Sequence, residues 1–202
     1  MFAFDNFEIG ALYLIQDFMR TPKLTDFLES MTDLGNAGFI WLALAIVLIC
    51  TKKYRKVGYA TFLSLAMNLI LTNGILKHIF KRARPFDTYP DLQPLIHEPT
   101  DWSFPSGHSS ASFAAAFVLY HYMPKKFSIP ALILATLIAF SRLYLGVHYP
   151  SDVIGGAAIG YLTAWASEKF MTYTEKKRAR NRRIWLIRKR QKAHEFPLPS
   201  NS

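Results

Sequence analysis

Residues 127–145 read FSIPALILATLIAFSRLYL, an apolar run whose single charged residue, Arg142, lies near its end. Further apolar runs cover residues 34–50, 57–76, 108–123 and 150–171. Each is near the ~20 residues that a helix needs to cross ~30 Å of hydrocarbon, although 34–50 and 108–123 are short. One such run could be a buried core helix. Five in succession predict an all-α fold, a polytopic bundle with five membrane spans.

The N-terminal segment 2–20 is harder to assign, because it is apolar but carries Asp5, Glu8 and Asp17. A second amphipathic stretch follows it and continues through Ser30. Segment 2–20 could lie in the membrane interface with its apolar face down, or it could be a weak first span. We expect a helix that is at least partly inserted, which leaves a sixth span possible.

Composition limits the class of protein. The 202 residues are 51% apolar, carry a formal net charge of +10 and contain one cysteine, Cys50. This length suits one membrane-embedded domain, predicted at 1–172, followed by a basic cytoplasmic tail at 173–202. A single cysteine excludes an intrachain disulfide and a cysteine-based metal cluster. The basic residues form no nucleic-acid-binding motif, so we expect no nucleic-acid partner.

The loops differ in charge, which predicts the orientation in the membrane. Basic residues fill segments 52–56, 125–126 and 176–192, whereas the loop 86–104 has four acidic residues and no Lys or Arg. If the spans alternate, the basic segments share one side, which the positive-inside rule makes cytoplasmic. We therefore expect a multi-pass cell-membrane protein with loop 86–104 on the extracellular or periplasmic face. The basic tail is either a solvated topology signal or a site of attraction to anionic lipid, worth roughly 1 kcal/mol per basic residue.

Pro105-Ser106-Gly107-His108 precedes the run of small residues that opens the third apolar stretch. Ser106 suits the N-cap of a helix, and Gly107 allows the backbone to approach a ligand closely. Free N–H groups and the positive end of the helix dipole favour a bound phosphate. His108 would then lie beside the anion, able to protonate a leaving group. The alternative is an ordinary capped helix with an exposed histidine.

A second histidine, His148, lies four residues before Asp152, and Pro150 between them suits the first turn of a helix. The carboxylate can hold one ring nitrogen and leave the other free, as in a Ser-His-Asp triad. A histidine prepared in this way can act as a base or a nucleophile. Arg142, six residues upstream, is within loop reach. The alternative is an interfacial histidine beside a helix-capping aspartate.

Four cations lie at the outer end of the second apolar run, where Lys77 and Arg84 bracket Lys81 and Arg82. Basic residues on the non-cytoplasmic side oppose the positive-inside tendency. Phosphate binding by an arginine fork and a lysine point charge would explain Lys77 and Arg84. Snorkelling toward the interface is the alternative, and we favour it for Lys81 and Arg82.

Packing residues and two intramembrane amides complete the pattern. Gly156-x3-Gly160 in the last apolar run predicts close helix approach. Asn68 and Asn73 lie inside a predicted span, where we expect interhelical hydrogen bonds, although such residues can also mark a site.

Together, Lys77-x6-Arg84-Pro85, Pro105-Ser-Gly-His108 and Ser141-Arg142-x5-His148-x3-Asp152 resemble the three-part signature of the type 2 phosphatidic acid phosphatase superfamily. That superfamily includes bacterial lipid phosphatases, glucose-6-phosphatase and the vanadium haloperoxidases. Every signature position is matched. The small size, the short 86–104 loop and the pattern Gln16-x3-Arg-Thr-Pro…Thr32-Asp-Leu-Gly are most similar to compact bacterial members.

The resemblance implies a role for each matched residue. His148 would attack phosphorus and become a phosphohistidine, oriented by Asp152. His108 would protonate the leaving oxygen and later activate water. The phosphate would be held by Lys77, Arg84, Ser106, Gly107 and Arg142. We expect no metal and no cofactor, and interpret the remaining histidines as bystanders: His78, His97, His121 and His194.

The function expected is that of an integral-membrane, metal-independent lipid phosphatase acting at the outer leaflet on a lipid phosphate in the bilayer. The resemblance suggests undecaprenyl diphosphate, phosphatidylglycerophosphate or phosphatidic acid, and we favour the polyprenyl diphosphate. One alternative is an enzyme similar to vanadate-dependent haloperoxidases. Another is a non-catalytic lipid-binding or transport protein, although no signature residue is lost and no internal repeat is found.

Overall fold

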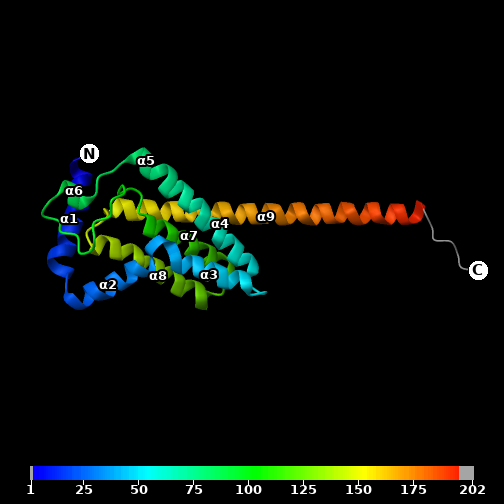
Figure 1. Ribbon diagram of the computed structural model, residues 1–202, viewed down its shortest axis with the longest axis horizontal. Helices are drawn as coiled ribbons and strands as arrows, with labels where there is room; N and C mark the ends of the chain where they lie inside the picture. Colours follow the sequence, from blue (N-terminus) through cyan, green and yellow to red (C-terminus); the bar gives the residue numbers. More distant parts are fainter. Residues whose placement is uncertain (1, 196–202) are drawn as a thin grey trace, which may run out of the picture. The chain divides into compact units, whose positions relative to one another are not determined.

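The computed structural model describes residues 2–195, and within that range every regular element is helical (Figure 1). The chain divides into two compact units, Met1–Ser167 and Glu168–Ser202. The elements in chain order are α1 (Phe2–Met19), α2 (Pro22–Leu34), η1 (Asn36–Gly38), α3 (Phe39–Cys50), α4 (Arg55–Leu69), η2 (Ile70–Leu76), α5 (Lys77–Phe80), α6 (Pro85–Thr88), α7 (Gly107–Tyr122), α8 (Lys125–Tyr144) and α9 (Pro150–Glu195). The all-α prediction is confirmed for this range. The predicted division into 1–172 and 173–202 stays a prediction, and residues 196–202 lie outside the described part.

Helix α7 is the central element of the first unit, in contact with α3, α4 and α8. It is built largely of alanine and serine, and Ala114, Ala115 and Ala116 are fully buried. Small side chains let neighbouring helices come close enough for direct polar contacts. Asn68 of α4 donates to Ser110 of α7 at 3.2 Å, which confirms the interhelical bond expected for that asparagine.

The first part of α9 packs against α7 through its glycines. A Cβ atom on Gly160 would lie 2.6 Å from the Ser110 carbonyl oxygen and 2.7 Å from the Ala114 nitrogen. A Cβ on Gly156 would lie 2.7 Å from the Ser106 carbonyl oxygen. The close helix approach predicted from Gly156-x3-Gly160 is therefore confirmed.

The count of five spans is not confirmed. By length and hydropathy, two helical segments of the described chain could cross a membrane, Arg55–Thr88 and Lys125–Tyr144. A third would be Pro22–Leu34 joined to Asn36–Cys50 across a bend of 43°. The predicted span at 34–50 is interrupted because Ala37 and Gly38 adopt positive φ angles of 49° and 68°. The remaining α3 has 12 residues, about 18 Å at 1.5 Å per residue.

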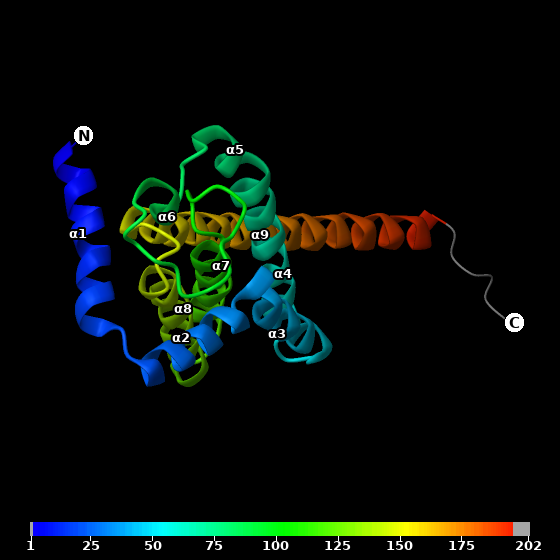
Figure 2. The same cartoon turned by 60° about the vertical axis from the view of Figure 1, so that its left-hand side comes forward.

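Helix α1 lies at the edge of the first unit (Figure 2). It packs against α8 and is tied by hydrogen bonds to the loop that follows α6. Arg20, just beyond its end, donates to the carbonyl oxygens of Gln93 at 2.8 Å and Tyr144 at 3.3 Å. The Gln16 side chain accepts from the Gln93 backbone at 3.2 Å. The Gln16-x3-Arg20 pattern thus fixes α1 to the loop 89–106 and to the end of α8. Whether α1 spans the membrane stays a prediction.

Substituting Gly160 with alanine should destabilise the first unit, because the new methyl group would meet α7 backbone atoms that cannot move aside. We expect a loss of about 1–3 kcal/mol, the usual cost of overpacking, measured as a lower unfolding temperature in detergent. Gly10→Ala is the matched control, since nothing lies within 4 Å of its Cβ, and it should be neutral or slightly stabilising. Equal unfolding temperatures for the two variants would contradict the packing argument.

Candidate active site

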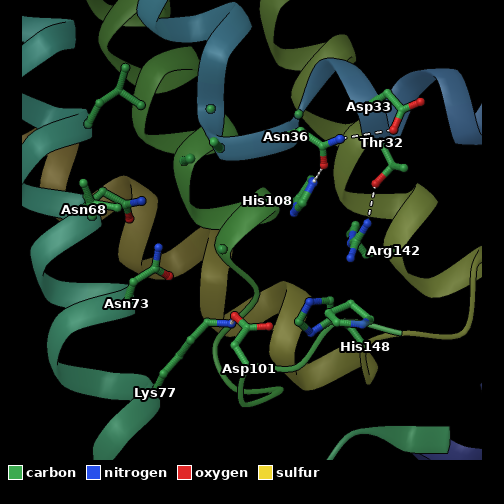
Figure 3. A pocket seen from close by; sticks show the side chains of 18 of the residues that line it. Thr32, Asp33, Asn36, Asn68, Asn73, Lys77, Asp101, His108, Arg142 and His148 are labelled. Carbon is green, nitrogen blue, oxygen red and sulfur yellow. Dashed lines mark hydrogen bonds and ion pairs between the residues drawn. The ribbon is translucent and has the colours of Figure 1, made fainter. Parts of the chain in front are cut away.

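The three motif stretches meet at one end of the first unit because each lies at a helix end. Lys77 follows η2, a π-helical segment, and Gly107 begins α7. Arg142 is in the last turn of α8, and Asp152 is in the first turn of α9. Six of the eight predicted site residues line one cavity of about 1000 Å³ (Figure 3): Lys77, Arg84, Gly107, His108, Arg142 and His148. The gathering of the motifs that the sequence predicts is thus present in the structure.

His148 is buried at the wall of this cavity with its two ring nitrogens in different surroundings. Its Nδ1 lies 3.3 Å from Asp152 Oδ2, and its Nε2 lies 3.4 Å from the Arg84 guanidinium. The carboxylate favours a proton on Nδ1 and leaves the Nε2 lone pair toward the cations. Burial, together with the charges of Arg84 and Arg142, lowers the pKa of His148 from 6.5 to about 3, despite the bond to Asp152. The imidazole is therefore neutral at pH 7, the form that is chemically able to act as a nucleophile.

Lys77 and Arg84 share one carboxylate, that of Asp101. The Lys77 ammonium donates to Asp101 Oδ2 and, at 2.8 Å, to the Trp102 carbonyl oxygen. Arg84 donates to Asp101 Oδ1 at 2.6 Å and to the Val147 carbonyl oxygen at 2.7 Å. Partial burial raises the pKa of Asp101, but the two cations outweigh this and lower it from 3.8 to about 2. An anion therefore already sits between the two predicted phosphate-binding cations.

Arg142 lines another side of the cavity, and not all of its N–H donors are used by the described residues. Its Nη1 donates to the Thr32 hydroxyl at 2.5 Å, while its Nε is buried without a hydrogen-bond partner among the described residues. Only 3% of Arg142 is exposed. A buried donor left unpaired is costly unless a ligand satisfies it. The position of this donor between His108 and His148 in Figure 3 suits an anion.

His108 faces the cavity from the first turn of α7. Its Nε2 lies 3.0 Å from the Asn36 side-chain oxygen, and Asn36 in turn donates to Asp33 at 3.1 Å. A Cβ on Gly35 would lie 2.8 Å from the His108 ring, so the glycine makes room for it. Thr32, Asp33 and Asn36 thus supply a polar rim that the motif analysis did not assign to the site.

Ser106 is the N-cap of α7, as predicted, and its hydroxyl accepts from the Ser109 N–H at 3.4 Å. Ser106 itself is fully buried and is not among the residues that line the cavity. Gly107 does line the cavity, and a Cβ there would lie 3.4 Å from the Asn73 side-chain oxygen. The helix start therefore reaches the cavity through the Gly107 backbone rather than through the serine hydroxyl.

The opposite wall of the cavity is apolar. It is formed by side chains of α3 and α4, namely Leu42, Phe62, Leu65, Ala66 and Leu69. The adjoining π-helical segment presents Asn73, and π-helical turns are frequent at functional sites. The cavity therefore combines a cationic end with an apolar wall, an arrangement that fits an amphiphile with an anionic head.

Three residues of the cluster were not predicted to be part of the site. The Ser103 hydroxyl donates to Asp152 Oδ2 at 2.5 Å, and Arg82 pairs with Asp152 Oδ1 at 2.8 Å. The snorkelling role favoured for Arg82 is therefore wrong: its charge is used inside the protein. Asp101 is the third, and its only signal in the sequence was its place in an acidic loop. Within residues 2–195, no group of three His, Cys, Asp or Glu side chains is arranged to hold a metal ion.

Comparison with known proteins indicates one family. Residues 53–176 match the sequence pattern of the PAP2 superfamily. The undecaprenyl-diphosphatase of Sulfolobus acidocaldarius is 33% identical over 156 residues, which cover 77% of this chain and 73% of that protein. The crystal structure of a transmembrane PAP2 type phosphatidylglycerolphosphate phosphatase from Bacillus subtilis superimposes with a TM-score of 0.69 at 30% identity, covering 83% of this chain and 86% of that one.

The haloperoxidase alternative receives support for the fold alone. A bacterial vanadium-dependent iodoperoxidase superimposes with a TM-score of 0.63 but is 17% identical, and the match covers 80% of this chain and 48% of that one. The apolar helices and the membrane relatives indicate a membrane protein. With the matched pattern, the relatives and the fold in agreement, the chain belongs to the PAP2 superfamily, and it is a phosphatase.

Proposed function

We propose that this protein is an integral-membrane lipid phosphatase that works through a phosphohistidine at His148. The observation that carries the proposal is the chemical character of the cavity lining. One end has a neutral histidine held by Asp152 together with three cations, and the other end has an apolar wall. A lipid phosphate has the same two-part character. Its head would bind among the cations while its tail lies along α3 and α4.

The reaction follows from the positions of the two histidines. His148 Nε2 attacks the terminal phosphorus, and the bond from that phosphorus to its leaving oxygen breaks. The leaving oxygen is the bridging oxygen of a lipid diphosphate or the ester oxygen of a lipid monophosphate, and protonated His108 gives it a proton. His108, now neutral, then takes a proton from water, whose oxygen attacks the phosphohistidine and releases inorganic phosphate and free His148. Lys77, Arg84 and Arg142 neutralise the charge on the transferring phosphoryl group, which is the main requirement of such a transfer.

The substrate is proposed from the cavity and from the relatives together. An undecaprenyl-diphosphatase and a phosphatidylglycerolphosphate phosphatase are both similar to this chain. We favour a polyprenyl diphosphate, with phosphatidylglycerophosphate and phosphatidic acid as the other candidates. The acidic loop 86–104 and the basic segments 52–56, 125–126 and 176–192 support an active site that faces the extracellular or periplasmic side.

The purified protein should release phosphate from these three lipids in detergent with EDTA present, and fastest from undecaprenyl diphosphate. A tail-less phosphate ester should have a kcat/KM at least about 100-fold lower, since burying four methylene groups alone is worth about 3 kcal/mol. Phosphate release measured for all substrates side by side tests this. Equal kcat/KM values with and without a tail would remove the role of the apolar wall, and no release from any lipid would overturn the proposal.

Substituting His148 and substituting His108 should impair the reaction at different steps. His148→Ala should lose about 10³-fold or more in kcat on every substrate, because no nucleophile remains. His108→Ala should lose about 10²- to 10⁴-fold on lipids, yet form the phosphoenzyme readily from p-nitrophenyl phosphate, whose leaving group needs no proton. Acid-quench trapping of the phosphoenzyme separates the two variants. Wild-type turnover by His148→Ala would show that another residue attacks.

Asp101→Asn should bind inorganic phosphate about fivefold more tightly, because removing a charge that competes for Lys77 and Arg84 is worth about 1 kcal/mol. The pKa of Asp101 is lowered to about 2, so the wild-type carboxylate stays ionised and the difference should persist from pH 5 to 8. Competitive inhibition by phosphate measures it. Asp91→Asn in the same loop is the control and should bind as wild type. Weaker binding by Asp101→Asn would mean that the carboxylate holds the cations in place for the phosphate.

A further inference from the structure

The carboxylate of Asp152 has a separate set of partners on each oxygen. Oδ2 lies 3.3 Å from His148 Nδ1 and accepts from the Ser103 hydroxyl at 2.5 Å and the Tyr149 N–H at 2.9 Å. Oδ1 accepts from Arg82 Nη1 at 2.8 Å. Asp152 is fully buried. Its rotation about the side-chain bond, and hence the direction in which it holds the imidazole, is set in part by Arg82.

Arg82 is held in turn by Glu8, a residue of the N-terminal helix. The second guanidinium nitrogen of Arg82 pairs with Glu8 Oε2 at 2.7 Å. Arg82 also donates to the Ser151 hydroxyl at 2.6 Å and lies over the Tyr149 ring at 3.8 Å from its centroid. Only 1% of Glu8 is exposed. The guanidinium is thus clamped between two buried carboxylates, one on each of its terminal nitrogens.

Glu8 also completes the start of the helix that carries Asp152. Its Oε1 accepts from the Ser151 N–H at 2.7 Å. This N–H belongs to the first turn of α9, where backbone donors have no partner within the helix. A carboxylate at this end of a helix is also favoured by the helix dipole. Glu8 therefore fixes both Arg82 and the backbone next to Asp152.

Burying two carboxylates beside a single cation costs free energy of folding, so the arrangement indicates that its geometry has a role. Breaking such a pair leaves an uncompensated buried charge. The planar arginine fork holds its two terminal nitrogens in a fixed geometry that suits two carboxylates, whereas a lysine presents a compact charge with rotatable donors. Lys81, the neighbour of Arg82, is exposed and takes no part in the contacts given above.

We propose that Glu8 and Arg82 are positioning residues for the nucleophile: they hold Asp152 so that its Oδ2 keeps the His148 ring aligned for attack. This inference rests on the proposed phosphohistidine mechanism. It gives the N-terminal helix α1 a part in the reaction, although none of its residues 6–19 lines the cavity described above.

The test compares Glu8→Gln, Arg82→Gln, Arg82→Lys and the double variant Glu8→Gln/Arg82→Gln. Arg82→Gln and Glu8→Gln should each lower kcat roughly 10- to 100-fold, the loss typical when a partner of an orienting residue is removed, with KM within about twofold because neither residue touches the substrate. Arg82→Lys should recover part of kcat. The double variant should be within about twofold of Arg82→Gln, since effects through one shared contact do not add.

Matched controls are Asp17→Asn, which removes an exposed charge from the same helix, and Lys81→Gln, which removes the charge next to Arg82. Both should keep the wild-type kcat. Unfolding temperatures of all variants are measured in parallel. The inference is overturned if Arg82→Gln keeps the wild-type kcat, if the two single effects multiply in the double variant, or if kcat falls only in step with the unfolding temperature.

Vanadate binding, measured by calorimetry, gives a readout that needs no turnover, because five-coordinate vanadate bonded to a ring nitrogen mimics the transition state. Arg82→Gln should bind it at least about tenfold more weakly than wild type, consistent with the loss expected in kcat. If wild type binds vanadate but hydrolyses none of the lipids, the proposed substrate class is wrong. The difference in vanadate affinity between wild type and Arg82→Gln then decides the positioning role by itself. Equal affinities would overturn that role. A wild-type protein that neither binds vanadate nor releases phosphate would overturn both proposals.

Discussion

Three cationic side chains are buried around one cavity, and their loss of solvating water is the constraint on which the rest of the site depends. Lys77, Arg84 and Arg142 are each at most 5% exposed. Burying a charge is tolerated only where other groups replace the lost water. The carbonyl oxygens of Trp102 and Val147, the Thr32 hydroxyl and the Asp101 carboxylate provide this replacement. The loops before α7 and α9 are thus held in place by the cations they solvate.

The need to replace the water lost by buried charges also explains why the site lies at helix ends. A helix begins with unpaired N–H groups and ends with unpaired carbonyl groups, so charges gathered there find backbone partners. Asp152 and Glu8 both accept from N–H groups at the start of α9 or just before it. Arg84 and Arg20 donate to carbonyl oxygens at or just after the end of α8. The backbone N–H and carbonyl groups of the short connection between α8 and α9 are therefore both hydrogen-bonded by charged side chains, which keeps His148 in one place.

The grouping of the motif residues could be predicted because each motif is defined by local spacing. A histidine four residues before an aspartate, or a serine before a small-residue helix, indicates its chemistry within one turn of chain. Glu8, Arg82 and Thr32 could not be predicted in this way, because they contact partners 70 to 143 residues away. The count of five spans is not confirmed, in part for a related reason. Mean hydropathy over 34–50 does not register the left-handed backbone at Ala37 and Gly38 that breaks the helix.

That break also has a part in the site. Because the chain turns at 35–38, Thr32 and Asn36 meet Arg142 and His108, while α3 continues away as the apolar wall. One uninterrupted helix over 34–50 would run straight past the site, since successive helical turns advance 5.4 Å along a single axis. The bend therefore separates the polar head region of the cavity from its apolar wall within one stretch of chain. A substrate that is charged at one end and apolar along the rest would meet Thr32 and Asn36 at its head, and Leu42 of α3 together with the side chains of α4 along its tail.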